Sequence, residues 1–321
     1  MNVCNSTNAQ RCRSAYYKQR ESAERRIQMV TIAFFNQKGG VGKSTSAANL
    51  SVIFAEKYKK RVLAIDCDAQ ANLSYYLTRN FDGNPAFAEE LNKLSETDTA
   101  ENDTAEMSAP DNSNADISSE NNSEDFTSLE NLIEPVTFEK HYKRFYPKLS
   151  ILRSSDNVDY INTNDATILK RFLTSVSDRY DICVLDCSPQ KTAMNILAIS
   201  AADCVVVPMD PQMVSLRGLS LVNDFIETAN SMSGGNTYIL GVYLSMFDNR
   251  ATLHNQVKEA FDENFGDLMF KTKIIRSRAL EESYSLAMPL WYYARLNPVT
   301  SCYEQLAKEI INRLRKNGAE I

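Results

Sequence analysis

The sequence lacks the cysteine pairs and the long apolar runs that mark several classes of protein. Its seven cysteines are odd in number and scattered, and no two of them form a Cys-x-x-Cys pair. This spacing argues against a zinc site, an iron–sulphur cluster or a redox switch. No stretch approaches the ~20 apolar residues that a membrane-spanning helix needs, and residues 1–10 lack the apolar centre of a secretion signal. We therefore expect a cytoplasmic protein without membrane contacts, whose cysteines are mostly small buried hydrophobic residues.

The chain does contain enough apolar residues for one large domain. It has 321 residues, of which 43% are hydrophobic, and a net charge of −6. That charge is unevenly distributed, because residues 82–128 hold thirteen acidic residues and only one basic residue, Lys93. The segment carries −12 and the remainder +6, so the negative total does not exclude nucleic acid as a partner.

Two segments differ from the rest in composition. Residues 82–128 are dominated by Asn, Ser, Thr, Asp and Glu, which predicts a disordered acidic low-complexity insert. Residues 1–28 form a basic extension without an apolar stripe, and we expect disorder there as well. This extension either adds a non-specific DNA contact or is an unstructured leader. We predict a single domain over 29–321, interrupted by the insert, with Met29 as a natural first residue.

Short apolar runs alternate with helical patterns in the predicted domain. This alternation predicts a doubly wound α/β fold, a mostly parallel sheet with helices on both faces. The last helical pattern runs from Val299 to Leu314, and we expect it to pack on the sheet rather than on a membrane. The strand candidates are Val30–Asn36, Arg61–Asp66, Leu149–Arg153, Asp181–Asp186, Asp203–Pro208, Tyr238–Ser245 and Lys271–Ile275.

A glycine loop follows the first strand candidate. It reads Lys38-Gly39-Gly40-Val41-Gly42-Lys43-Ser44-Thr45 and precedes a helical pattern, the context that makes this motif a phosphate-binding P-loop. Backbone N–H groups of such a loop point at phosphate oxygens, and glycines let the chain approach them closely. We predict that the loop binds ATP, that Lys43 bridges the β- and γ-phosphates, and that the Ser44 hydroxyl ligates Mg²⁺.

Three carboxylates are candidates to complete the site. Asp66 and Asp68 end the second strand candidate, and Asp186 ends the apolar run that starts at Asp181. Ligands of open α/β folds bind at the carboxyl edge of the sheet, where these acids are expected. Asp186 has the form of a Walker B aspartate, which holds Mg²⁺ through water. We predict a functional role for Asp186 and for one of the pair Asp66/Asp68.

Four motif segments together resemble the ParA/Soj partition ATPases, within the MinD-like group of deviant Walker ATPases. The segments are Asn36–Thr45, Asp66–Leu73, Tyr180–Cys187 and Met246–Arg250. The resemblance implies slow ATP hydrolysis and an ATP-bound homodimer in which Lys38 reaches the phosphates held by the partner subunit. It also implies that Asp68 positions the attacking water and that Asp66 supports the Mg²⁺ site. Pro208 is assigned to the nucleotide site as well.

The same resemblance implies non-specific binding of double-stranded DNA by the dimer. Arg250 matches an arginine that contacts DNA in the family, and a basic cluster follows at Lys271, Lys273, Arg276 and Arg278. Such a cluster can hold phosphates by charge, and the alternative interpretation is a solvated strand edge. The implied role is DNA segregation at the nucleoid, with hydrolysis stimulated by a ParB-like partner.

The sequence departs from the family pattern at several positions. Ala69 and Ala71 replace a proline and a glycine, Ser188 precedes Pro189 after the Walker B motif, and Ala279 occupies the place of an arginine. Alternative functions are a MinD-like membrane-associated positioning ATPase, an ATP-driven reductase or ligase, and an ATP-binding interaction platform. The lack of paired cluster cysteines argues against the reductase, and the lack of an added substrate domain argues against the ligase.

Overall fold

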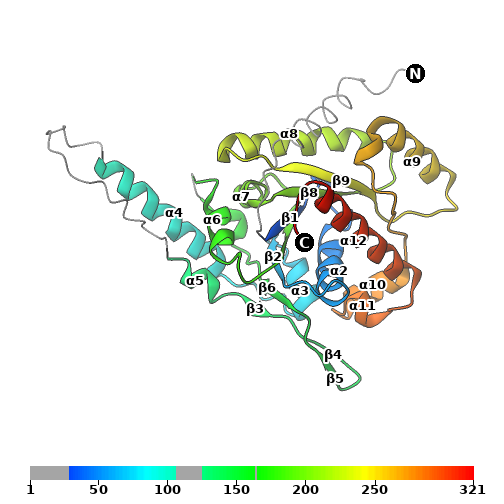
Figure 1. Cartoon of the computed structure of the whole chain (residues 1–321), viewed down its shortest axis with the longest axis horizontal. Coiled ribbons are helices and arrows are strands. Elements are labelled where there is room, and N and C mark those ends of the chain that lie inside the picture. The colour runs from blue at the N-terminus through cyan, green and yellow to red at the C-terminus, as the bar shows by residue number, and fades with distance from the viewer. Residues whose placement is uncertain (1–28, 106–124, 163–164) are drawn as a thin grey trace.

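The structure is a computed structural model that describes residues 29–105, 125–162 and 165–321; the expectations for residues 1–28 lie outside this range (Figure 1). Within it, seven strands form one sheet in the order β3-β6-β2-β7-β1-β8-β9. All neighbouring strands are parallel except β3, which runs antiparallel to β6. This confirms the predicted mostly parallel sheet. The strands are β1 (Val30–Phe34), β2 (Val62–Cys67), β3 (Glu134–Pro135), β6 (Leu149–Leu152), β7 (Ile182–Cys187), β8 (Cys204–Met209) and β9 (Tyr238–Leu244).

Helices cover both faces of the sheet, as predicted (Figure 1). Strand β1 shows why, because its side chains alternate between two apolar clusters: Ile32 and Phe34 belong to one, Ala33 to the other. On the first face lie α2 (Lys43–Glu56), α3 (Asn72–Thr78), α10 (Arg278–Ser285), α11 (Leu290–Tyr293) and α12 (Pro298–Lys316). On the second lie α4 (Ala86–Ala105), α5 (Thr127–Glu130), α6 (Ile168–Ser175), α7 (Ala193–Ala201), α8 (Ser215–Ser233) and α9 (Thr252–Phe265).

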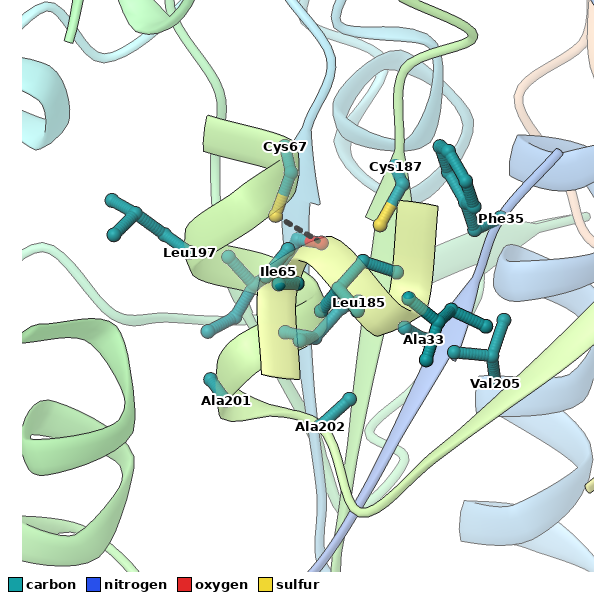
Figure 2. Packing of buried hydrophobic residues seen from close by; sticks show 14 of the residues in the cluster. Ala33, Phe35, Ile65, Cys67, Leu185, Cys187, Leu197, Ala201, Ala202 and Val205 are labelled. Atoms are coloured by element: carbon teal, nitrogen blue, oxygen red, sulfur yellow. Dashed lines mark hydrogen bonds between the residues drawn. The ribbon is translucent and has the colours of Figure 1, made fainter. Parts of the chain in front are cut away.

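Four cysteines are part of the apolar core. Cys67, Cys183, Cys187 and Cys204 are free and fully buried. Figure 2 shows Cys67 and Cys187 at the ends of their strands, above Ile65 and Leu185 of the same cluster. The expectation that these cysteines act as small hydrophobic residues is confirmed.

Helix α12 packs on the sheet through its apolar face, as predicted. Tyr303, Leu306 and Ile310 are buried in the first cluster. Further along, the Arg313 guanidinium donates to the carbonyls of Leu240, Leu268 and Met269. A Cβ atom on Gly241 of β9 would lie 2.5 Å from Arg313 Nη1 and 2.6 Å from the Phe270 ring, so the glycine leaves room for these two side chains.

The predicted strand Lys271–Ile275 is wrong. This segment forms no strand, and its one isolated bridge joins Ile275 to Phe247, three residues beyond the end of β9. The reason lies in α12, where the Glu309 carboxylate accepts hydrogen bonds from the backbone N–H groups of Lys271 (2.8 Å) and Thr272 (2.9 Å). Backbone donors that would extend a strand ladder are therefore satisfied by a side chain.

The prediction that residues 82–128 form a disordered insert is wrong for its described ends. Helix α4 occupies Ala86–Ala105, and its first turns bury Phe87 and Leu91 in the second apolar cluster. Phe126, near the other end of the segment, is buried in the same cluster. Phe87 and Leu91 are four residues apart and so share one face of α4, a spacing that the acidic composition around them obscures. Residues 106–124 lie outside the described range.

A two-stranded hairpin was not predicted. Strands β4 (Phe138–Lys140) and β5 (Lys143–Phe145) pair antiparallel apart from the main sheet and extend from the body of the molecule beside α11 (Figure 1). Three-residue strands are too short to give a clear alternating pattern in the sequence.

Candidate nucleotide site

The P-loop connects β1 to α2 and forms an open cradle. Gly40 (φ 73°) and Gly42 (φ 86°) adopt left-handed conformations that favour glycine, and α2 begins directly afterwards at Lys43. A Cβ atom added to Gly39, Gly40 or Gly42 would meet no heavy atom of the described residues within 4 Å. The loop therefore leaves space at the positive end of the α2 dipole, where phosphate groups bind in this type of motif.

Lys43 lies beside this cradle and close to two of the predicted acids. Its side chain is buried, and its Nζ lies 3.3 Å from the Lys38 carbonyl oxygen. Burial lowers the pKa of Lys43, while the nearby Asp186 and Asp68 carboxylates partly offset this effect. A buried ammonium group with space in front of it is suited to a phosphate anion.

Asp66 and Asp186 lie side by side in the sheet. They are register partners on the neighbouring strands β2 and β7, and both are fully buried. Burial raises the pKa of Asp186 well above its usual value, and repulsion from Asp66 adds to the effect. Two buried carboxylates that are neighbours in the sheet cannot both ionise without a compensating positive charge.

The Asp186 carboxylate fits a magnesium ligand. Neither of its oxygens has a hydrogen-bond partner among the described residues, although the nearby Ser44 hydroxyl favours the charged form of the group. Buried unpaired carboxylate oxygens next to a hydroxyl match the oxygen ligands that Mg²⁺ prefers. In the described residues no three His, Cys, Asp or Glu side chains form a metal-binding group, so phosphate or water oxygens would have to complete the coordination.

Asp66 uses both of its carboxylate oxygens in hydrogen bonds, and its predicted supporting role at the metal stays a prediction. Its Oδ2 accepts hydrogen bonds from the backbone N–H and the hydroxyl of Ser74, both at 2.7 Å, and its Oδ1 accepts from the Asp68 N–H at 3.2 Å. Burial raises the pKa of Asp66 to about 7, against the opposing effect of these bonds. Asp66 thus fixes the start of α3 and the segment that carries Asp68.

Asp68 begins the turn that leads into α3. Its carbonyl accepts from the Ala71 N–H (2.9 Å), and its Oδ1 accepts from the Gln70 N–H (3.0 Å). Ala71 then has a left-handed conformation (φ 50°), which explains why a glycine suits this position in the family pattern. The prediction that Asp68 positions water is compatible with this place near Lys43 but is not tested by it.

Lys38 contacts residues that the sequence analysis missed. Its Nζ donates to Asp210 Oδ2 at 2.6 Å and to Gln212 Oε1 at 2.9 Å. The loop after β8 supplies both partners, and the Lys38 side chain stays 41% exposed whereas that of Asp210 is 7% exposed. Asp210 directly follows β8, and Asp186 is the second-last residue of β7. An acid at the end of an apolar run is the sequence signal that could have identified Asp210 as well.

Pro208, in β8, is connected to the P-loop through Asn36. Its carbonyl accepts from Asn36 Nδ2 at 2.7 Å, and Asn36 Oδ1 in turn accepts from the Lys38 N–H at 2.9 Å. Pro208 thus links β8 to the P-loop through Asn36, and its predicted contact with the nucleotide stays a prediction.

The predicted DNA-binding residues are unequally accessible. Arg250 is 92% exposed beside Asp248, and Lys271, Arg276 and Arg278 are exposed as well. Lys273 is half-buried, with its Nζ 4.2 Å from the centre of the Phe247 ring.

The displaced arginine near the start of α10 is explained by packing. Ala279, at the position where the family pattern has arginine, packs against the first apolar cluster. Arg278, one residue earlier, begins α10 and is exposed.

Comparison with known proteins agrees with the fold and the motifs. A family model described as an AAA domain matches residues 29–238. The chromosome-partitioning ATPase Soj of Treponema pallidum is 30% identical over 286 residues, which cover 88% of this chain and 97% of that protein. The chain belongs to the ParA/Soj family of P-loop ATPases. Soj of Bacillus subtilis, named a sporulation initiation inhibitor protein, is also 30% identical, over 87% of this ParA-family chain and 97% of its own.

Solved structures support the same fold at lower sequence identity. Apo McdA from Cyanthece superposes with a TM-score of 0.65 at 19% identity and covers 88% of this ParA-family chain and 99% of its own. The septum site-determining protein MinD from Pyrococcus horikoshii, solved with Mg-ADP, has a TM-score of 0.63 at 21% identity, over 91% of this chain and 100% of its own. The predicted relation to the ParA and MinD group is confirmed.

Proposed function

We propose that this ParA-family ATPase is a DNA-segregation switch that binds Mg²⁺-ATP at the P-loop, dimerises, binds DNA without sequence preference and is released by partner-stimulated hydrolysis. The observation that carries the nucleotide part is the open glycine cradle flanked by buried Lys43 and the unpaired carboxylate of Asp186. The ammonium group of Lys43, the hydroxyl of Ser44 and the unpaired carboxylate of Asp186 lie where the triphosphate and its Mg²⁺ would bind.

Each of these groups has a distinct task in the proposal. The P-loop N–H groups and Lys43 bind and orient the phosphates, while Ser44 and Asp186 would hold Mg²⁺. Asp66 would support them from β2, where it also fixes the start of α3. Bound Mg²⁺ supplies charge stabilisation to the phosphates. Asp68 orients the attacking water, and Lys38 reaches the phosphates of the partner subunit, where a cation delivered in trans offsets developing negative charge.

DNA binding is proposed for the exposed arginines and lysines between β9 and α10. Arg250, Arg276 and Arg278 would contact phosphate oxygens, with Lys271 beside them. Lys273 is assigned a weaker share, because its ammonium group is packed over Phe247. A ParB-like protein is the proposed activator, and the nucleoid is the proposed location. Residues 1–28 are proposed to precede the ATPase domain and the acidic insert to interrupt it, and no role is proposed for either segment.

The alternative of a membrane-associated positioning ATPase is less well supported. In the part of the chain that the structure describes, no helix combines the length and apolarity needed to cross a bilayer. The apolar face of α12, the helix that would have to insert as a tail, is buried against the sheet. Co-sedimentation with anionic vesicles and ATP would reveal membrane binding directly.

The test is binding to random double-stranded DNA with ATP, ADP or no nucleotide across a salt series. We expect binding only with ATP, weakening with salt, and losses in Lys38→Ala and Arg250→Ala. Lys170→Ala removes an exposed lysine on α6, outside the segment from β9 to α10, and is the matched control that should bind normally. Absence of DNA binding under every nucleotide condition would refute the proposal.

A further inference from the structure

The β4–β5 hairpin is held rigidly at its base. Phe138 and Phe145 are cross-strand partners, and their rings lie 5.0 Å and 4.6 Å from that of Tyr292 in α11. Lys140 Nζ donates to the carbonyls of Tyr292 (2.8 Å) and Tyr293 (2.9 Å). Aromatic packing and a charge-assisted anchor therefore fix the direction in which the tip extends.

The tip holds two large residues in an unfavourable backbone conformation. His141 (φ 51°) and Tyr142 (φ 62°) are the two turn residues, and both are left-handed. Such two-residue turns favour Asn-Gly, because a Cβ in this conformation costs about 1–2 kcal/mol per residue. Retaining histidine and tyrosine here costs stability without any gain in packing for Tyr142, which is 99% exposed. Conformational strain of this kind is typical of functional positions.

The hairpin and the short segment that follows it carry positive charge and aromatic rings. Lys143, next to the tip, and Lys148, between β5 and β6, are exposed, and Tyr146 in the same connection is 70% exposed. The one acidic residue of the hairpin strands, Glu139, is paired with Arg144 at 3.2 Å. The lysines thus remain as net positive charge beside two accessible phenol hydroxyls, which are common donors to nucleic-acid phosphates.

We infer that the β4–β5 hairpin is a second contact for double-stranded DNA, separate from the Arg250 region. Lys143 and Lys148 would contact phosphates, and the His141–Tyr142 tip would enter a groove, since a two-stranded ribbon fits the major groove. The inference rests on the proposed function, because it requires the protein to bind DNA. It adds a contact that the ParA-family motifs in this sequence do not include.

The experiment measures DNA binding with ATP across a salt series for two hairpin variants of the full chain. Lys143→Gln/Lys148→Gln removes the charges, and we expect the slope of log K against log salt to become shallower by about 0.9 per lost phosphate contact, close to 2 in total. His141→Asn/Tyr142→Gly converts the tip to the favoured turn. We expect it to weaken binding at least about 3-fold while leaving the melting temperature equal or higher.

The matched control removes equal charge elsewhere. Lys93→Gln/Lys170→Gln changes two exposed lysines on α4 and α6 and should leave the salt slope unchanged. If the wild type binds DNA but both hairpin variants bind as it does, the hairpin inference is wrong and the proposed function stands. If the wild type binds no DNA, the proposed function itself fails.

Discussion

The Lys38 ammonium group lies 2.6 Å from the Asp210 carboxylate of the same chain, although 172 positions separate the two residues. In the proposed dimer this lysine would instead reach the partner's phosphates. The contact with Asp210 must then break, and each dimer breaks two such contacts. Formation of the dimer therefore competes with an ion pair inside each subunit.

Asp210→Asn should favour the ATP-bound dimer. Asparagine keeps an acceptor for the Ser215 hydroxyl, which bonds Asp210 Oδ1 at 2.6 Å, but removes the charge that holds Lys38. An ion pair of this exposure contributes about 0.2–1 kcal/mol, so two of them should tighten dimerisation by about 2- to 30-fold. Sedimentation equilibrium with ATP checks this, and Asp224→Asn on the exposed side of α8 is the control. Weaker dimerisation would show instead that Asp210 positions Lys38 for the partner.

Asp186→Asn should separate folding from Mg²⁺ binding. The substitution is nearly isosteric and replaces a buried carboxyl group whose pKa is raised by burial and by Asp66. The nucleotide-free protein should therefore melt at the same or a higher temperature. The additional thermal stabilisation by Mg²⁺-ATP over ATP with EDTA should disappear. A variant that keeps the full magnesium-dependent increase would exclude Asp186 as a ligand. Asp178→Asn, an acid in the turn before β7, provides the comparison.

Ala71→Gly should stabilise the protein. Ala71 has a left-handed conformation (φ 50°) at the start of α3, and glycine adopts this conformation without the steric penalty of about 1 kcal/mol. Part of that gain is lost to the greater freedom of glycine in the unfolded chain. We expect the free energy of unfolding in urea to rise by up to about 1 kcal/mol. Ala69→Gly, at a position without positive φ, should lower the free energy of unfolding. Equal effects of the two changes would contradict the explanation by the left-handed conformation of Ala71.

The Arg61–Asp181 pair should make stability depend on acid pH. Burial acts to raise the pKa of Asp181, but hydrogen bonds from the Arg61 guanidinium and its N–H (2.7 Å) outweigh it and lower the pKa below its usual value. A lowered folded-state pKa stabilises the protein above about pH 3.9, and this contribution is lost as the pH falls through the folded value.

Asp181→Asn should therefore cost about 1 kcal/mol at pH 7, a modest amount because solvent screens the half-exposed pair. The difference from wild type should shrink as the pH falls below about 4. Urea unfolding at several pH values measures both. A difference that stays constant with pH would mean that the loss is due to packing rather than charge.

Several features of the site follow from the sequence because they depend on residues close together in the chain. The P-loop is one continuous segment, whose glycines and Lys43 specify a turn and the start of a helix locally. Asp186 was predicted because a buried strand that ends in an acid is visible as an apolar run. The strands β1, β2 and β7 were predicted for the same reason.

Other features depend on segments that are distant in the sequence, and only the tertiary structure decided them. The register of β2 against β7 puts Asp66 beside Asp186, and the loop after β8 brings Asp210 to Lys38. Glu309 on the last helix determines that Lys271 does not join a strand, and Phe87 and Leu91 become core residues only where α4 packs against α5 and α6. Local patterns specify which element forms, whereas hydrogen bonds and burial between distant segments decide where each side chain finds its partner.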